Sequence, residues 1–409
     1  VYRSRLQLDQ DRAARGSSLA RVYDDLGFSQ LGINASTNSL TLDPSNASAH
    51  RFLSDTYQNI RRREVARVSE LLQAQMMQDI NINPVQPSLA ATNLNIATLG
   101  GPAQPGFNEF TPLFERNKAQ LNATLLGGNN DTYGGEAVVS GVYDRFSFSA
   151  GATSYDTDGW RPNNGIDATI YNIYGQWAVT NELNLQVEYQ NKESTEGDLA
   201  FNFDPEDYLE DKTLERDQSS ARIGLRYSPT QSSTFLLSYI NNDNDELLFE
   251  SIPLDEFSTF TIDSDMEDKG DQYEGQYIYL NQSFNLIAGA THSKSDVTFR
   301  DDIVLSDIDF GPIFTLQETS EEETKQSRGY VYSNIPMWDN RVNWTFGLSY
   351  DDYQEDILEE TTWNPKIGVQ WSVTEAVLLR AAAFRTVKPL LVNNRTLEPT
   401  QVAGFNQFF

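Results

Sequence analysis

Few side chains in this sequence can carry out chemistry. The 409 residues include two histidines, His50 and His292, and no cysteine. The missing cysteines exclude thiolate metal sites, thiol nucleophiles and disulfide bonds. A catalytic or metal site built on histidine needs acids close by in space, and neither histidine lies in a motif that supplies them. We interpret both as surface or packing residues, and the sequence predicts no enzyme and no cofactor.

Acidic side chains form the densest group of candidate ligands. Residues 241–271 contain eleven Asp and Glu residues. Asp263 and Asp265 have the spacing that opens a calcium loop, but the later ligand positions and the closing glutamate are missing. A charged, solvated outer loop is the simpler interpretation. The alternative is a weak site for divalent cations on the acidic outer loops.

A glycine-rich stretch, GGNNDTYGG at 127–135, is the one candidate phosphate loop. No Lys-Ser or Lys-Thr pair follows it, and no helix is predicted to begin there. It is typical of a hairpin loop instead. The net charge of −29 also argues against nucleic acid as a partner, because no basic surface is available to neutralise phosphates.

The elements that position these residues are mainly strands. In NELNLQVEYQ, residues 181–190, apolar and polar side chains alternate, which predicts a strand with one apolar and one polar face. Leu183, Leu185, Val187 and Tyr189 share the apolar face. No run of about 18 apolar residues predicts a transmembrane helix, but a transmembrane β-strand needs only about 9–11 residues, half of them polar.

The joins between strands alternate in length along residues 117–409. Short joins such as 143–145 and 281–283 alternate with long ones such as 193–216, 243–270 and 301–324. Short turns at one end and long loops at the other are typical of an outer-membrane β-barrel. We count about thirteen strands. Since bacterial barrels have an even number, the antiparallel barrel is predicted to be incomplete in this chain, with residues 387–409 forming an outside loop or the start of a descending strand.

Residues 1–80 are predicted to be helical. Leu19 and Tyr23 recur as Leu53 and Tyr57 after 34 residues, and Pro44 follows Asp43 between the two pairs. This period predicts paired helices of the tetratricopeptide type, the end of a longer array. The proline-rich residues 81–116 are predicted to be a linker.

Several stretches resemble one group of bacterial proteins, among them ARVYDDLGFSQLG, DPSNASAHRFLSD and VVSGVYDRFSFSAG. The group comprises outer-membrane proteins in which periplasmic tetratricopeptide repeats precede a porin-like or TonB-dependent-receptor-like β-barrel. The resemblance implies an α + β chain of several domains, with its helices in the periplasm and its barrel in the outer membrane. It implies little about function.

The faces of the predicted strands assign residues to the barrel interior and to the lipid. The candidates for the pore lining are Gln186, Glu188, Arg222, Arg226 and Arg380. Alternatively, these side chains pair with one another and fill a narrow interior. The candidates for lipid contact are Leu183, Leu185, Val187, Tyr189, Trp344 and Phe346.

Three functions follow from this architecture. The first is an outer-membrane conduit, in which the repeats bind a periplasmic protein or guide a polymer into a water-filled barrel. The alternatives are receptor-type nutrient uptake and a surface scaffold that binds an extracellular or periplasmic partner. Outer-membrane lipid is the partner that all three require.

Overall fold

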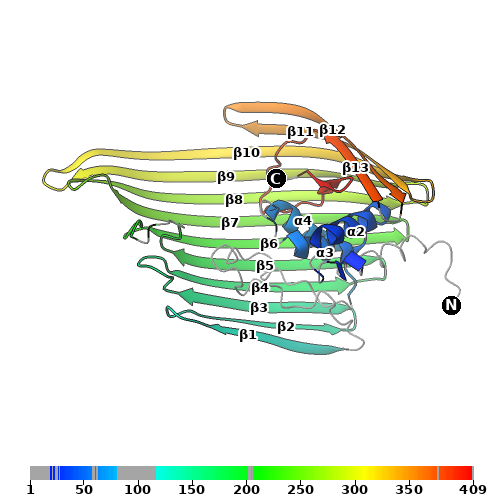
Figure 1. The fold of residues 1–409 in the computed structure, drawn as a ribbon, viewed down its shortest axis with the longest axis horizontal. Coiled ribbons are helices and arrows are strands. Elements are labelled where there is room, and N and C mark those ends of the chain that lie inside the picture. Colours follow the sequence, from blue (N-terminus) through cyan, green and yellow to red (C-terminus); the bar gives the residue numbers. More distant parts are fainter. Residues whose placement is uncertain are drawn as a thin grey trace.

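Over the residues that it describes, the computed structural model has helices beside one large β-sheet, and a second sheet of two short strands, β14 (Gln401–Val402) and β15 (Phe405–Asn406) (Figure 1). It describes residues 28–57, 63–80, 117–200, 206–374 and 377–407, with residues 19, 20, 22, 23, 26, 60 and 204 in addition. The predicted linker over 81–116 lies outside the described residues. The helices are α2 (Ser29–Leu42), α3 (Ala47–Tyr57) and α4 (Glu64–Met77).

Thirteen strands form the sheet, in the order β1 to β13, and each pairs with the next in antiparallel register. The strands are β1 (Lys118–Gly127), β2 (Tyr133–Tyr143), β3 (Phe146–Thr157), β4 (Ile166–Ala178), β5 (Leu183–Glu196), β6 (Thr213–Thr230), β7 (Ser233–Pro253), β8 (Ser258–Leu280), β9 (Asn285–Asp307), β10 (Gly311–Met337), β11 (Val342–Glu355), β12 (Leu358–Thr374) and β13 (Val377–Phe384). The predicted antiparallel sheet of about thirteen strands is therefore confirmed. The strands β1 and β13 are its two edges, so the sheet is open in this chain.

Several joins that the sequence predicted as long loops are strands instead. The strands β7, β8, β9 and β10 are 21, 23, 23 and 27 residues long, about twice what a bilayer requires. Residues 243–253 pair with residues 259–269 along almost the whole acidic stretch. The prediction was wrong because hydropathy marks only the part of a strand that meets lipid, whereas backbone pairing continues through polar residues.

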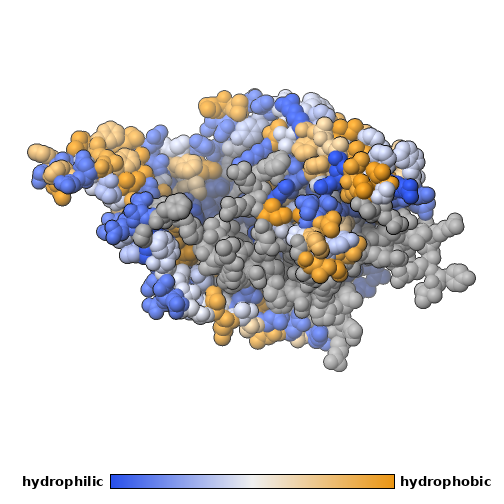
Figure 2. Space-filling model, in the orientation of Figure 1, coloured by the Kyte–Doolittle hydropathy of each residue, from blue (hydrophilic) through white to orange (hydrophobic). Residues whose placement is uncertain are grey.

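The longest hairpin, β9–β10, ends in exposed apolar side chains (Figures 1 and 2). Ile308 is 76% exposed and Phe310 is 87% exposed at its turn. Figure 2 shows this apolar tip at the end of the hairpin that projects from the rest of the sheet.

The sheet has the inverse of a soluble protein's burial pattern. Along β5, Gln186 and Glu188 are 2% and 6% exposed, while Val187 between them is 56% exposed. The same inversion recurs on β4, where Ile173 is 61% exposed and Asn172 is 1% exposed. Exposed apolar area of this extent is unfavourable in water. We call the two sides of the sheet the polar face and the apolar face.

The three helices lie against the polar face (Figure 1). α2 ends at Leu42, just before Asp43 and Pro44, because proline disfavours a helical residue before it. The side chain of Asn46 accepts a hydrogen bond from the Ala49 amide at 3.0 Å and caps the start of α3. The helical character predicted for residues 1–80 is confirmed over α2, α3 and α4.

The helices pack against the polar face, while tetratricopeptide repeats and a periplasmic position of the helices stay predictions. An apolar patch on the polar face explains the packing, because Leu236 of β7 and Ile278 of β8 pack with Leu72 and Met76 of α4. Each such buried side chain contributes about 1.5–3 kcal/mol. At Leu236 and Ile278 an apolar side chain stands where the alternation along the strand predicts a polar one. This break in the pattern indicates that another element packs on the polar face.

Candidate functional site

The polar face of the sheet carries the candidate site, and α4 covers part of it. Gln186 donates to the Gln75 carbonyl at 2.6 Å, and Gln176 donates to the Gln78 carbonyl at 3.1 Å. Arg226 donates to the Met77 carbonyl. These three strand side chains therefore satisfy the carbonyl groups at the end of α4, which have no partner within the helix.

A buried group of three charges lies beside α4. Arg222 of β6 is opposite Glu188 of β5 in the register, and their charged atoms are 3.0 Å apart. Arg395 approaches the other carboxylate oxygen of Glu188 at 2.8 Å. All three side chains are buried, so each charge depends on the others to offset its loss of water. Glu188 and Arg222 thus pair across strands, which was the alternative to an open pore lining.

A second buried cluster is centred on Glu398. Its carboxylate lies 2.9 Å from Nζ of Lys366 on β12 and 3.0 Å from Nη1 of Arg328 on β10. Tyr332 also donates to it. Burial alone would raise the pKa of the Glu398 carboxyl, but the two cations outweigh burial and hold this pKa below its usual range.

Residues 385–407, here called the crossing segment, supply both Arg395 and Glu398. The segment runs across the polar face rather than forming the predicted outside loop or descending strand (Figure 1). The Leu390 and Val392 amides donate to the side chains of Gln326 on β10 and Gln272 on β8. The prediction was wrong because the partners of this segment lie far away in the sequence.

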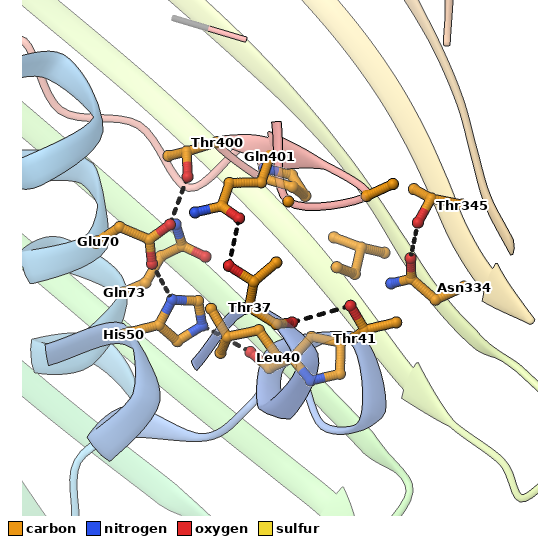
Figure 3. Close-up of a pocket in the computed structure, with 15 residues that line it drawn as sticks. Thr37, Leu40, Thr41, His50, Glu70, Gln73, Asn334, Thr345, Thr400 and Gln401 are labelled. Atoms are coloured by element: carbon orange, nitrogen blue, oxygen red, sulfur yellow. Dashed lines mark hydrogen bonds and ion pairs between the residues drawn. The ribbon is translucent and has the colours of Figure 1, made fainter. Parts of the chain in front are cut away.

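The crossing segment also binds the helices (Figure 3). Thr400 donates to Glu70 of α4, and the Thr396 amide donates to the Ser69 hydroxyl at 3.1 Å. On its other oxygen, Glu70 contacts Nδ1 of His50. His50 is therefore buried in the interior, where its Nε2 donates to the Pro44 carbonyl at 2.9 Å.

A small cavity remains between the helices and the crossing segment, and Figure 3 shows its lining. Its volume is about 60 Å³, less than the about 150 Å³ that holds benzene. Thr37, Thr41 and Gln73 are among the polar groups around it. The cavity has room for a few water molecules and is too small for a large solute.

The remaining residues singled out from the sequence lie either beside the crossing segment or on the apolar face of the sheet. Arg380 of β13 donates to the Gly404 carbonyl at 3.3 Å and lies over the Phe405 ring. Among the lipid-contact candidates, Val187, Tyr189 and Phe346 are more than 40% exposed on the apolar face, while Leu183, Leu185 and Trp344 are half-buried there.

The repeat-packing residues do not all pack alike. Leu53 and Tyr57 are buried in one cluster with Ile33 and Ala66. Pro44 is also buried, Tyr23 is half-buried, and Leu19 is 46% exposed.

Metal ligands do not gather in the described part of the chain. Within those residues, no group of three or more His, Asp or Glu side chains could hold an ion. Asp265 instead pairs with Arg300 of β9 at 2.8 Å, and His292 contacts the Ser327 hydroxyl at 2.9 Å on the apolar face.

Within the described residues, no helix is long and apolar enough to cross a membrane.

Sequence reasoning missed two residues of the site, Arg395 and Glu398, and interpreted His50 only as a surface or packing residue. A single acid in the crossing segment, next to Pro399, was a weak signal for a buried role. No local pattern reveals its partners, because Arg328 and Lys366 occupy ordinary inward positions of their strands.

Comparison with known proteins gives the family. Residues 116–407 match the family described as TonB dependent receptor-like, beta-barrel. No curated protein matches the chain.

Solved structures are similar in fold. FpvA of Pseudomonas aeruginosa, in complex with a heterologous pyoverdine and iron, has a TM-score of 0.53 and 13% identity, over 63% of this chain and 40% of that one. The ferric yersiniabactin uptake receptor FyuA of Yersinia pestis has a TM-score of 0.50 and 12% identity, over 63% of this chain and 45% of that one. The chain thus spans less than half the length of these structures.

The family match covers most of the chain and the whole described sheet. The inverted burial pattern and the polar, charge-bearing interior agree with a sheet that separates lipid from a polar lumen. The chain belongs to the TonB-dependent-receptor-like β-barrels, whose place is the bacterial outer membrane.

Proposed function

We propose that this protein is a gated uptake transporter of the outer membrane, of the receptor type. The proposal rests on one observation: α2–α4 and the crossing segment occupy the polar face of the sheet. An open conduit needs a water-filled interior, whereas here Gln186, Glu188 and Arg222 are buried beneath protein. Family membership supports the same function over the conduit with a periplasmic repeat module.

The two faces of the sheet have distinct roles in this proposal. Val187, Tyr189 and Phe346 face lipid, and Gln186, Glu188 and Arg222 line a passage that is closed at rest. The helices lie near the short turns, since the Thr41 carbonyl accepts from Asn285, the first residue of β9. The crossing segment reaches further along the strands, as far as Gln326 of β10. A solute entering from the long hairpins meets this segment first.

Similarity in fold is the only support for a proposed class of substrate. The similar structures are receptors for ferric pyoverdine and ferric yersiniabactin, and a ferric chelate is accordingly the first substrate to test. Low identity means that the contacts selecting a ligand are this chain's own.

Planar-bilayer conductance of the full protein tests the closed passage. We expect no stable large steps from the unmodified protein, and frequent openings from Arg395→Ala, which breaks the contact of the crossing segment with Glu188. Lys388→Gln, which removes an exposed charge in the same segment, is the control and should stay silent. Stable, large, weakly selective steps from the unmodified protein would contradict the proposal and support an open conduit.

A further inference from the structure

The outer part of β10, residues 311–324, is a free edge of the sheet. β9 pairs with β10 from Gly311 to Asn334, whereas β11 pairs only with residues 325–337. β11 ends at Glu355 and turns into β12, and Figure 1 shows β10 running past the end of that hairpin. Strands added at β1 and β13 to close the barrel would not cover this free edge.

The free edge presents backbone groups without a strand to bind. In an antiparallel sheet, the N–H and C=O groups of successive residues point alternately to the two neighbouring strands. The Arg341 carbonyl accepts from the Ser372 amide of β12. Following the alternation from this pair back through β11 directs the odd-numbered residues of β10 toward the β11 side. Over residues 315–323 no described strand lies there, so these groups can bind one more strand.

The free edge lies beyond the part of the sheet that the membrane covers. Counting from the short turn after Met337, a span of about 9–11 residues ends near Gln326. Residues 311–324 are therefore outside the bilayer, in the long hairpins. Their unpaired N–H and C=O groups need hydrogen-bonding partners, which a lipid chain does not offer.

Apolar side chains lie at the outer end of the free edge. Phe314 and Leu316 point to the same side of β10 and are 53% and 40% exposed. Leu305 and Ile303 of β9 are opposite them in the register, so the apolar surface extends from the edge into the hairpin. An added strand would bury part of this surface with apolar side chains of its own.

Acidic side chains occupy the rest of the free edge. Glu318 and Glu322 lie on the same side of β10 as Leu316, and Glu321 lies on the other side. Among the described residues these three acids have no ion-pair partner, whereas Glu323 pairs with two lysines of the hairpin. A second copy of the edge would bring like charges together, which disfavours self-pairing. A strand with basic side chains has the complementary charge.

We propose that the free edge is a docking site for another protein, which adds a basic, extended segment to β10 as a further antiparallel strand. Main-chain hydrogen bonds to the odd-numbered residues of 315–323 supply affinity, and side chains supply selectivity. Basic side chains face Glu322 and Glu318. Apolar ones, two and four residues after the residue opposite Glu318, face Leu316 and Phe314. The site is outside the passage on the polar face and does not depend on the proposed transport.

A synthetic peptide tests the added strand. The peptide Lys-Lys-Thr-Thr-Lys-Thr-Ile-Thr-Ile has basic and apolar side chains at the required spacing, and fluorescence anisotropy measures its binding to the full protein in lipid nanodiscs. We expect saturable binding of one peptide per protein. Methylation of the amides at the fourth and sixth peptide positions, which face β10, should weaken binding by about tenfold or more. Methylation at the fifth and seventh positions, whose amides face water, should leave binding unchanged.

Variants of the protein test the same geometry. Thr319→Pro removes an amide on the free side of β10, a position where an edge strand tolerates proline, and should weaken binding by about tenfold. Glu318→Gln combined with Glu322→Gln should weaken binding by about fivefold. The control is Glu256→Gln combined with Asp309→Asn, which removes two exposed acids from the hairpin turns and should change binding little.

Amide hydrogen exchange of residues 298–305 in β9 shows that the hairpin stays folded in each variant. Attraction of the peptide to the net negative charge would give equal binding of the two methylated peptides and equal effects of the two double variants. Either result would overturn the proposal. Unchanged binding to a folded Thr319→Pro variant, or no saturable binding to the unmodified protein, would overturn it as well.

Discussion

Replacing Glu398 with glutamine tests how the crossing segment is held. The substitution keeps the size of the side chain and removes its charge. Two buried cations then lose a partner, Lys366 at 2.9 Å and Arg328 at 3.0 Å. Arg328 keeps Asp351, so Lys366 is the group left without a counter-charge.

The expected cost follows from the burial of these groups. The side chains of Glu398 and Lys366 are 0% and 1% exposed, so solvent does not screen the lost interaction. Removing one partner of a buried pair costs about 3–5 kcal/mol. The retained contact of Arg328 favours the lower end, and about 3 kcal/mol corresponds to roughly a 100-fold rise in the population of the opened segment.

Amide hydrogen exchange measures this opening directly. The Val392 amide donates to Gln272, and the Thr396 amide donates to Ser69, so both report on the segment's contacts with its neighbours. Their exchange in Glu398→Gln should accelerate by about two orders of magnitude, while peptides from β4 and β5 should keep their protection. Lys388→Gln should leave all of them unchanged. Unchanged exchange in Glu398→Gln, or equal acceleration in both variants, would refute the idea that the Glu398 cluster anchors the segment.

Two further predictions use the same protein. The pKa of Glu398 is held below its ordinary value of 4.5, so its contribution to stability is complete above pH 4.5 and is lost as the pH falls through the lowered value. Protection of the Val392 amide, corrected for intrinsic exchange, should therefore decrease below pH 4.5, and a flat profile would show that Glu398 does not titrate with opening. On the apolar face, Val187→Arg should destabilise the folded barrel by about 2–4 kcal/mol in urea titrations in lipid vesicles, because Val187 is near the middle of the span. Glu193→Arg, further along the same face of β5, should cost only about 0–1 kcal/mol, and equal costs at the two positions would contradict the proposed lipid level.

The strands could be predicted because their signal is local. Alternation along residues 181–190 placed Val187 and Gln186 on opposite faces, and the structure has them on opposite faces. The pairing of Glu188 with Arg222 was foreseen as one of two alternatives. Deciding between them required the register, which sets these residues opposite each other.

The contents of the polar face could not be predicted, because their contacts join distant parts of the chain. Glu398 meets Lys366 and Arg328 only after two strands and the crossing segment are in place. The contacts of the helices could not be predicted for the same reason. The 34-residue spacing of Leu and Tyr predicts tetratricopeptide repeats, which stays a prediction, and it says nothing about what the outer surface of α4 contacts.

In the proposed gated transporter, the contacts that stabilise the interior also close it. Arg395 and Glu398 are buried, so water does not replace the charge partners that either side chain would lose. In that proposal, a solute that passes along the polar face displaces the crossing segment and thereby separates Arg395 from Glu188 and Glu398 from Lys366. A ligand opens this route only if it binds the displaced state more tightly than the closed one by at least the cost of those separations. Opening therefore requires either a ligand that replaces the lost charge partners or force applied to the segment through the helices it contacts at Ser69 and Glu70.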